Sequence, residues 1–202
     1  KMLIEYSLET FQKHPLIDAI VVVLPDKCPK EIKKALKANY PKISEFVSGG
    51  KERFLSSWAA VKLFKKRPQD NLLLHDAARP CVTEKIINNI TQQLNEYQAI
   101  VTALPATDTI LQITNSQSVS GVLDRSNLYY AQTPQAFRAG LLYEVFTQLL
   151  DDKDFTPTDE TGVVTHYRPD ISIKIVLGDP DNFKVTYPSD IERVKQILSP
   201  RL

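Results

Sequence analysis

The residues best suited to do chemistry are the run 75–80, His-Asp-Ala-Ala-Arg-Pro, which directly follows the apolar run 71–74, Asn-Leu-Leu-Leu. A short apolar run predicts a buried strand, and ligands of open α/β sheets lie at the carboxyl ends of strands. Asp76 at such an end could hold Mg²⁺, and Arg79 could bind phosphate or carboxylate. Taken alone, the two residues would equally fit a turn-capping Asp and a surface Arg.

A second strand-to-helix turn, Ser48–Ser56, contains Gly49 and Gly50. Glycine lets backbone N–H groups approach a ligand closely, and a helix N-terminus favours anionic or carbonyl acceptors. The turn has neither the P-loop ending nor the spacing of a dinucleotide-binding fingerprint. Many strand-to-helix turns contain glycine only because the backbone geometry requires it. This turn therefore indicates a ligand site only when it is considered together with other motifs.

A third turn, Gly178–Thr186, adds Asp181 and Lys184 after another predicted strand. Two acids from separate strand ends, Asp76 and Asp181, could share one Mg²⁺ on a nucleotide. Lys184 could act as a point charge on a phosphate. The alternative for this stretch is a solvated surface turn.

The elements that must position these turns alternate along the chain. Apolar periodicity predicts helices at 2–13, 30–39, 52–66, 84–97, 139–150 and 159–167, with a last helix opening at Pro188, and strands at 17–24, 43–47, 71–75, 99–104 and 171–177. Thr83 and Thr158 are the expected N-caps of the helices that follow them. This order predicts an α/β fold with a doubly wound, mostly parallel sheet of the Rossmann-like type and helices on both faces.

Residues 105–134 interrupt this alternation because they show no helical period. The alternating stretch 109–114, the turn 115–118 and the stretch 120–123 predict a β-hairpin. Since a hairpin is not needed to close an α/β core, we expect a projecting arm used for self-association in a homodimer. The alternative is a small hairpin folded back on its own domain.

The first residues already have helical spacing and lead directly into the strand 17–24. A helix feeding a strand is the second half of a βαβ unit, so we expect a first strand and its loop before Lys1. Residues 1–202 are otherwise expected to form a single domain.

Composition narrows the class of protein. The chain has 202 residues, 43% hydrophobic and 24% charged, and a formal net charge of +1. These values suit a globular α/β domain and give no reason to expect a nucleic-acid partner. No apolar stretch is long enough to span a membrane, and Cys28 and Cys81 have no metal-ligand spacing. A cytoplasmic protein without a membrane or nucleic-acid partner is the expectation.

Together the motifs resemble the 2-C-methyl-D-erythritol 4-phosphate cytidylyltransferase family. The matching runs follow the family's order over nearly the whole chain: Gly49-Gly50 with Glu52-Arg53 and Ser56, His75 to Pro80, Pro105 with Asp108-Thr109, Asp124-Arg125, Gln132 to Gln135, Thr158-Asp159-Glu160, and Asp181-Asn182 with Lys184 to Thr186. Each run is weak alone, but their joint occurrence is specific.

The resemblance implies a nucleotidyltransferase fold, a homodimer and Mg²⁺ as cofactor. It implies that the phosphate of methylerythritol 4-phosphate attacks the α-phosphorus of CTP and that pyrophosphate leaves. Positioning and charge neutralisation would then be the catalytic work, because both reactants are anionic. A pentitol-phosphate enzyme, such as a ribitol 5-phosphate cytidylyltransferase, and an inactive CTP-binding module are the alternatives.

The resemblance also implies roles for single residues. The expected CTP contacts are Gly49, Gly50, Arg53, Ser56, Asp76 and Ala77, with Arg53 holding the glycine loop. Asp76 and Asp181 are the expected metal ligands, and together with Lys184 they are the expected catalytic residues. The expected contacts to the sugar phosphate are Thr109, Arg125, Thr133, Thr158 and Lys184, with Thr109 and Arg125 reaching the neighbouring subunit's site.

One departure from the family's pattern concerns its glycine-rich loop, which carries an arginine and, further on, a lysine. In the family this segment cradles the triphosphate, and it would precede Lys1. We expect negligible turnover from any protein that lacks these two basic groups.

Overall fold

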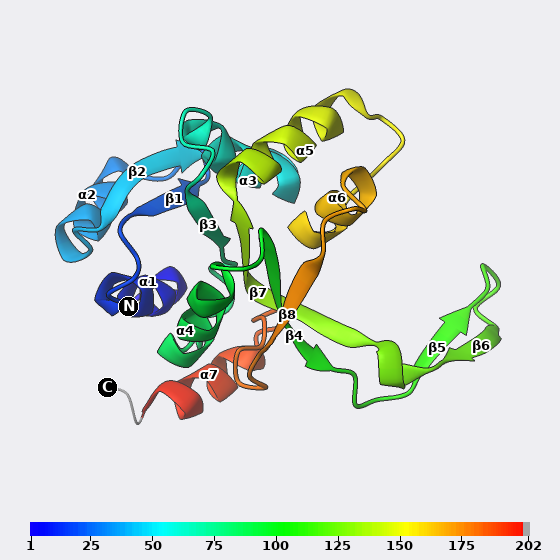
Figure 1. The fold of residues 1–202 in the computed structure, drawn as a ribbon. Coiled ribbons are helices and arrows are strands. Elements are labelled where there is room, and N and C mark those ends of the chain that lie inside the picture. Colours follow the sequence, from blue (N-terminus) through cyan, green and yellow to red (C-terminus); the bar gives the residue numbers. More distant parts are fainter. Residues whose placement is uncertain (200–202) are drawn as a thin grey trace.

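The computed structural model describes residues 1–199, so residues 200–202 of the predicted domain lie outside the described residues. Helices and strands gather around one main sheet, and a hairpin extends away from it (Figure 1). The helices are α1 (Leu3–Lys13), α2 (Lys30–Asn39), α3 (Arg53–Val61), α4 (Glu84–Gln93), α5 (Ala139–Asp151), α6 (Glu160–Tyr167) and α7 (Asp190–Leu198), with short 3₁₀ turns η1 (Lys62–Phe64) and η2 (Arg125–Asn127). The strands are β1 (Ile20–Leu24), β2 (Ile43–Ser48), β3 (Asn71–Leu74), β4 (Ala99–Pro105), β5 (Ile110–Ile113), β6 (Val119–Leu123), β7 (Tyr129–Arg138) and β8 (Ile173–Leu177).

The main sheet is mixed, whereas the sequence predicted a mostly parallel one. Its strand order is β3-β7-β4-β8, and β7 runs antiparallel to both of its neighbours. Only the pairs β4–β8 and β1–β2 are parallel. The α/β class is thus confirmed, and the parallel arrangement is wrong for the centre of the sheet.

Strand β7 was not predicted because residues 105–134 were assigned as a whole to the arm. The chain returns from the hairpin straight into the sheet without a helical crossover, and such a return produces an antiparallel neighbour. Pro134 also argues against a central strand, since proline cannot donate to the ladder. The structure accommodates it at a shift of register.

That shift lies between Val101 and Thr102 of β4. Val101 pairs with Gln135 and Thr102 pairs with Gln132, so Thr133 and Pro134 form an extra step on β7. The Thr102 hydroxyl donates a 2.6 Å hydrogen bond to the carbonyl of Pro134 and fixes this step. An irregularity of this kind redirects a side chain, here Thr133, out of the regular alternation of the strand.

Helices cover both faces of the main sheet. On one face, α3, α5 and α6 bury an apolar cluster that includes the fully buried Leu142, Phe146 and Val163. On the other face, α4 packs Ile86 and Ile90 against the sheet (Figure 1). A separate cluster joins α1 and α2 to β1 and β2. The sheet edge that carries the site is therefore held by rigid elements on both sides.

The strands β1 and β3 belong to different sheets and line a common cavity of about 1340 Å³. Its walls include Val21, Val23, Leu73 and Asp76.

The expected hairpin is present as the antiparallel pair β5–β6 and projects from the main sheet (Figure 1). Its large apolar side chains are exposed: Leu111, Ile113, Val119, Val122 and Leu123. Its use as an arm for self-association remains a prediction. Among the described residues no helix has the length and apolar character needed to cross a membrane.

Two helix starts test the capping predictions. The Thr83 side chain accepts a hydrogen bond from the backbone N–H of Ile86, which confirms it as the N-cap of α4. At α6 the N-cap is Asp159 and not Thr158, because the Asp159 carboxylate accepts from the N–H of Gly162 at 2.8 Å. Asp and Thr both cap helices, so the one-residue offset follows from which side chain faces the helix axis.

Candidate functional site

Asp76 lies at the carboxyl end of β3, where the sequence places it, and three cationic side chains face it. One carboxylate oxygen is 3.5 Å from the Arg53 guanidinium. The other is 3.3 Å from the Lys184 ammonium and 3.9 Å from Nε of Arg79. The structure thus brings together the predicted residues Asp76, Arg53 and Lys184 from three separate segments.

These charges set the protonation of Asp76. Burial favours the neutral acid, but the charges of Arg53 and Lys184, the Lys184 hydrogen bond and the charge of Arg79 outweigh it and lower the pKa of Asp76. The carboxylate therefore stays ionised at neutral pH. Only 19% of its side chain is exposed, so its interactions with cations are screened less than those of a surface acid.

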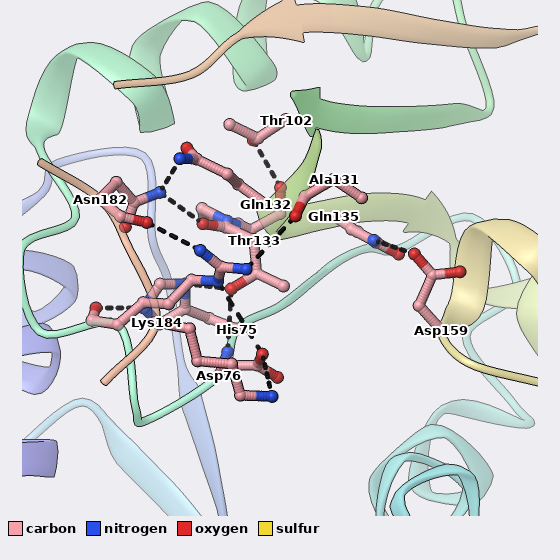
Figure 2. Close-up of polar contacts among 12 residues, drawn as sticks. His75, Asp76, Thr102, Ala131, Gln132, Thr133, Gln135, Asp159, Asn182 and Lys184 are labelled. Atoms are coloured by element: carbon pink, nitrogen blue, oxygen red, sulfur yellow. Dashed lines mark hydrogen bonds and ion pairs between the residues drawn. The ribbon is translucent and has the colours of Figure 1, made fainter. Parts of the chain in front are cut away.

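A chain of hydrogen bonds fixes the backbone at Asp76 (Figure 2). The N–H of Asp76 donates to the Thr133 hydroxyl at 3.0 Å. That hydroxyl lies 3.1 Å from Nδ1 of His75, and Nε2 of His75 lies 3.0 Å from the carbonyl of Arg79. A neutral ring with its proton on Nε2 satisfies the whole chain, because Nδ1 then accepts from the hydroxyl. Thr133, predicted as a substrate contact, thus holds Asp76 in place.

Arg79 connects three segments, and both terminal nitrogens of its guanidinium are bonded to backbone carbonyls. Its guanidinium donates to the carbonyls of Asn182, at 2.9 Å, and Ala131, at 3.3 Å. Asn182 is fully buried and donates in turn to the carbonyl of Thr133 (Figure 2). Arg79 therefore ties the loop that carries Lys184 to β7 and to the end of β3.

The glycine turn after β2 is closed on itself. A Cβ atom at Gly50 would lie 2.2 Å from Cβ of Leu55, so no other residue fits there without a shift. The N–H of Gly50 donates to the Ser56 hydroxyl at 3.1 Å, and Ser56 also bonds the carbonyl of Glu52. Ser56 shapes this turn and lines the cavity, as does the exposed Ala77, which follows β3.

Glu160 was not among the predicted site residues, yet it is the most buried acid near Asp76, with 1% of its side chain exposed. Both of its oxygens accept from Arg53, at 2.7 and 2.8 Å, and one also accepts from Ser57 at 2.6 Å. In the sequence, Asp159 and Glu160 both fit the preference for acids in a first helical turn. Nothing in that pattern tells which of the two faces inward.

The remaining predicted residues lie apart from this cluster. The side chain of Asp181 is half exposed and pairs with Arg193 at 3.4 Å. Thr158 is exposed in the loop before α6. Thr109 precedes β5 and Arg125 follows β6, so both lie on the arm. Arg125 donates to the carbonyl of Thr107 there.

The donor set suits one kind of metal. Groups of three or more His, Cys, Asp or Glu side chains that could enclose an ion are absent from residues 1–199. Mg²⁺ usually binds through one or two carboxylates together with substrate phosphates and water, so Asp76 alone fits such an ion when a phosphate ligand is bound. The contacts of Asp181 within the described residues do not join it to Asp76. A shared two-acid site therefore remains a prediction.

Comparisons with known proteins agree with one another. The family model described as 2-C-methyl-D-erythritol 4-phosphate cytidylyltransferase matches residues 1–200. The protein of that name from Thermobifida fusca is 37% identical over 97% of this chain and 81% of its own length. The crystal structure of 4-diphosphocytidyl-2C-methyl-D-erythritol synthase from Anaerococcus prevotii superimposes with a TM-score of 0.89 at 27% identity, over 98% of this chain and 86% of that one.

A relative of another description also matches. The bifunctional ribulose 5-phosphate reductase/CDP-ribitol pyrophosphorylase Bcs1 of Haemophilus influenzae is 32% identical over 95% of this chain, which spans 41% of that protein. The pentitol-phosphate alternative is therefore also represented among the proteins that are similar to this chain.

The enclosed ring of His75 predicts a dependence of stability on pH. Burial lowers the pKa of His75 to about 4, against the opposing effects of the Arg79 carbonyl and the Asp76 charge. Its pKa in the unfolded chain is about 6.5. The unfolded state therefore binds the proton first, and the free energy of unfolding falls by up to about 3 kcal/mol as the pH drops from about 6.5 to about 4. His75→Gln should flatten this part of a urea-unfolding series, and an unchanged slope would contradict the assignment.

Proposed function

Because the chain belongs to the 2-C-methyl-D-erythritol 4-phosphate cytidylyltransferase family, we propose that the Asp76 cluster is the place where CTP and the sugar phosphate react. The reaction transfers a cytidylyl group from CTP to 2-C-methyl-D-erythritol 4-phosphate in isoprenoid biosynthesis. The observation that carries the placement is one ionised carboxylate that lines the cavity and faces Arg53, Arg79 and Lys184.

The chemistry asks for positioning and charge neutralisation. A phosphate oxygen of the sugar phosphate forms a bond to the α-phosphorus of CTP, and the bond from that phosphorus to the oxygen leading to the β-phosphate breaks. Both reactants are polyanions, so catalysis requires cations held at fixed places. Lys184 supplies a point charge on a loop that Arg79 and Asn182 hold rigidly. Arg53 and Ser56 line the nucleotide side of the cavity.

We propose Mg²⁺ as the cofactor, with Asp76 as its ligand and Asp181 as a second candidate. When bound, Mg²⁺ neutralises phosphate charge and withdraws electron density from the phosphorus. Asp76 suits this role because its charge and its backbone are both fixed by neighbours. The expected CTP contacts at Gly49, Gly50, Ser56 and Ala77 belong to the same proposal.

We further propose that the hairpin joins two copies of the chain and that the protein acts in the cytoplasm as a homodimer. Apolar side chains stand exposed along β5 and β6, as expected of a surface that a second copy covers. Thr109 and Arg125 lie on this arm, apart from Asp76 of the same chain. Within a homodimer they would serve the neighbouring site, and Thr158 would contact the sugar phosphate from the α6 side.

The substrate test uses the full-length gene product with CTP and Mg²⁺. Pyrophosphate release is measured with methylerythritol 4-phosphate and, separately, with ribitol 5-phosphate. We expect turnover with the first, whereas turnover only with the second would place the protein with Bcs1-like enzymes. CTP binding by calorimetry without turnover on either substrate would leave an inactive CTP-binding module.

Asp76→Asn tests the metal assignment. Asn keeps the shape of the side chain and loses its charge, so kcat should fall by about a hundredfold or more while the protein still unfolds cooperatively. Rates are measured across a Mg²⁺ titration, with Asp181→Asn beside it to decide whether the second acid shares the ion. Near-normal activity of Asp76→Asn would remove Asp76 from the site.

Arg125→Ala tests the arm. We expect the KM for the sugar phosphate to rise about tenfold or more, with a much smaller change in the KM for CTP, because a lost charged hydrogen bond to phosphate costs on the order of 2 kcal/mol. Arg168→Ala, which removes an arginine from a surface ion pair outside the arm, is the matched control. An effect on CTP alone, or a monomer in sedimentation, would overturn the cross-subunit contact.

A further inference from the structure

Glu160 is a buried charge whose partners come from one other helix. Its carboxylate is held by both terminal nitrogens of Arg53, at the first position of α3, and by the Ser57 hydroxyl one turn later. Such a paired geometry fixes the plane of a guanidinium as well as its position. The plane of Arg53 is therefore set by Glu160.

The start of α6 is itself pinned, so Glu160 is a fixed anchor. Gln135 of β7 donates to the Asp159 carboxylate at 2.8 Å (Figure 2). The side-chain oxygen of Gln135 accepts from the N–H and the hydroxyl of Thr161. The residues on both sides of Glu160 are thereby tied to the central strand of the main sheet.

Among residues 1–199, Arg53 has one other carboxylate within ion-pair distance. Its second terminal nitrogen, which bonds Glu160 at 2.8 Å, lies 3.5 Å from Asp76. The shorter and paired contacts of the guanidinium are therefore those with Glu160, and its contact with Asp76 is the longer one. Burial disfavours the charge on Arg53, but the hydrogen bond and charge of Glu160, with Asp76 and Asp159, raise the pKa of Arg53 above its usual value. The arginine stays charged at the nucleotide side of the cavity.

We infer that Glu160 is a positioning residue for the transfer reaction: it orients Arg53 so that the arginine serves the nucleotide side of the site and keeps only a longer, 3.5 Å contact with the Asp76 carboxylate. Glu160 acts through Arg53 and touches no reactant. If Glu160 loses its charge, Arg53 turns to Asp76, which is the nearest remaining carboxylate. The inference rests on the proposed location of the reaction at Asp76.

The first test is Glu160→Gln in the full-length protein. The variant keeps the size of the side chain and the hydrogen bond from Ser57, but the paired bonds to Arg53 are lost. We expect the Kd for CTP, measured by calorimetry without the second substrate, to rise about tenfold to a hundredfold, as is usual when a supporting partner is removed. The KM for the sugar phosphate should change much less than the KM for CTP.

Glu144→Gln is the matched control, because Glu144 also accepts from an arginine, Arg168, but at the surface of α5. It should leave CTP affinity unchanged. If the wild-type protein does not bind CTP, the proposed function fails. If the wild type binds and Glu160→Gln binds equally well, the inference alone fails, whatever the change in thermal stability.

A second pair of variants separates orientation of Arg53 from a general structural effect. If Glu160 acts through Arg53, adding Glu160→Gln to Arg53→Met should leave CTP affinity at the value of Arg53→Met. The double variant contains no unpaired buried charge, so it remains suitable for measurement when Arg53→Met alone is unstable. If the double variant instead loses CTP affinity by the product of the losses in the two single variants, the inference is overturned.

Discussion

The site depends on one constraint, which is that a partly buried carboxylate must stay ionised at the end of β3. Burial alone would favour the neutral form of Asp76, and only the surrounding cations keep its pKa low. A cation on a flexible side chain would also satisfy this requirement by collapsing onto the carboxylate, and would then block it. In this structure the two arginines have fixed partners of their own, whereas Lys184 pairs with the carboxylate at 3.3 Å.

Polar contacts among residues from separate segments supply those partners. Glu160 holds Arg53, the carbonyls of Ala131 and Asn182 hold Arg79, and the loop that carries Lys184 is bonded to the turn after Asp76 through Val185 and Ala78. Thr133 and His75 hold the backbone of Asp76 itself. Half of these interactions involve β7. Its shift of register brings Thr133 beside Asp76, and its regular part anchors the start of α6 through Gln135.

The sequence predicted the parts of this arrangement that follow from local patterns. The strand end at Asp76, the glycine turn and the loop with Lys184 were identified because each follows an apolar run and carries a distinct chemical group. The antiparallel β7 was missed since Pro134 and polar residues hide its strand character, and pairing partners are not encoded locally. The role of Thr133 as a support of Asp76, and the burial of Glu160, could not be predicted because both depend on contacts between residues far apart in the chain.

The charges of the cluster also bear on the proposals of a bound Mg²⁺ and of a second copy of the chain. Arg53, Arg79 and Lys184 face Asp76 and Glu160, which leaves a surplus of one positive charge. Arg79 donates its hydrogen bonds to backbone carbonyls, so even this surplus of positive charge is only partly available to a ligand. Two polyanionic reactants brought together there would repel each other more strongly than this surplus can offset. The proposed Mg²⁺ and, in the proposed homodimer, Arg125 of the second copy would each add positive charge to this cluster. These two proposals thus address the same shortage of positive charge.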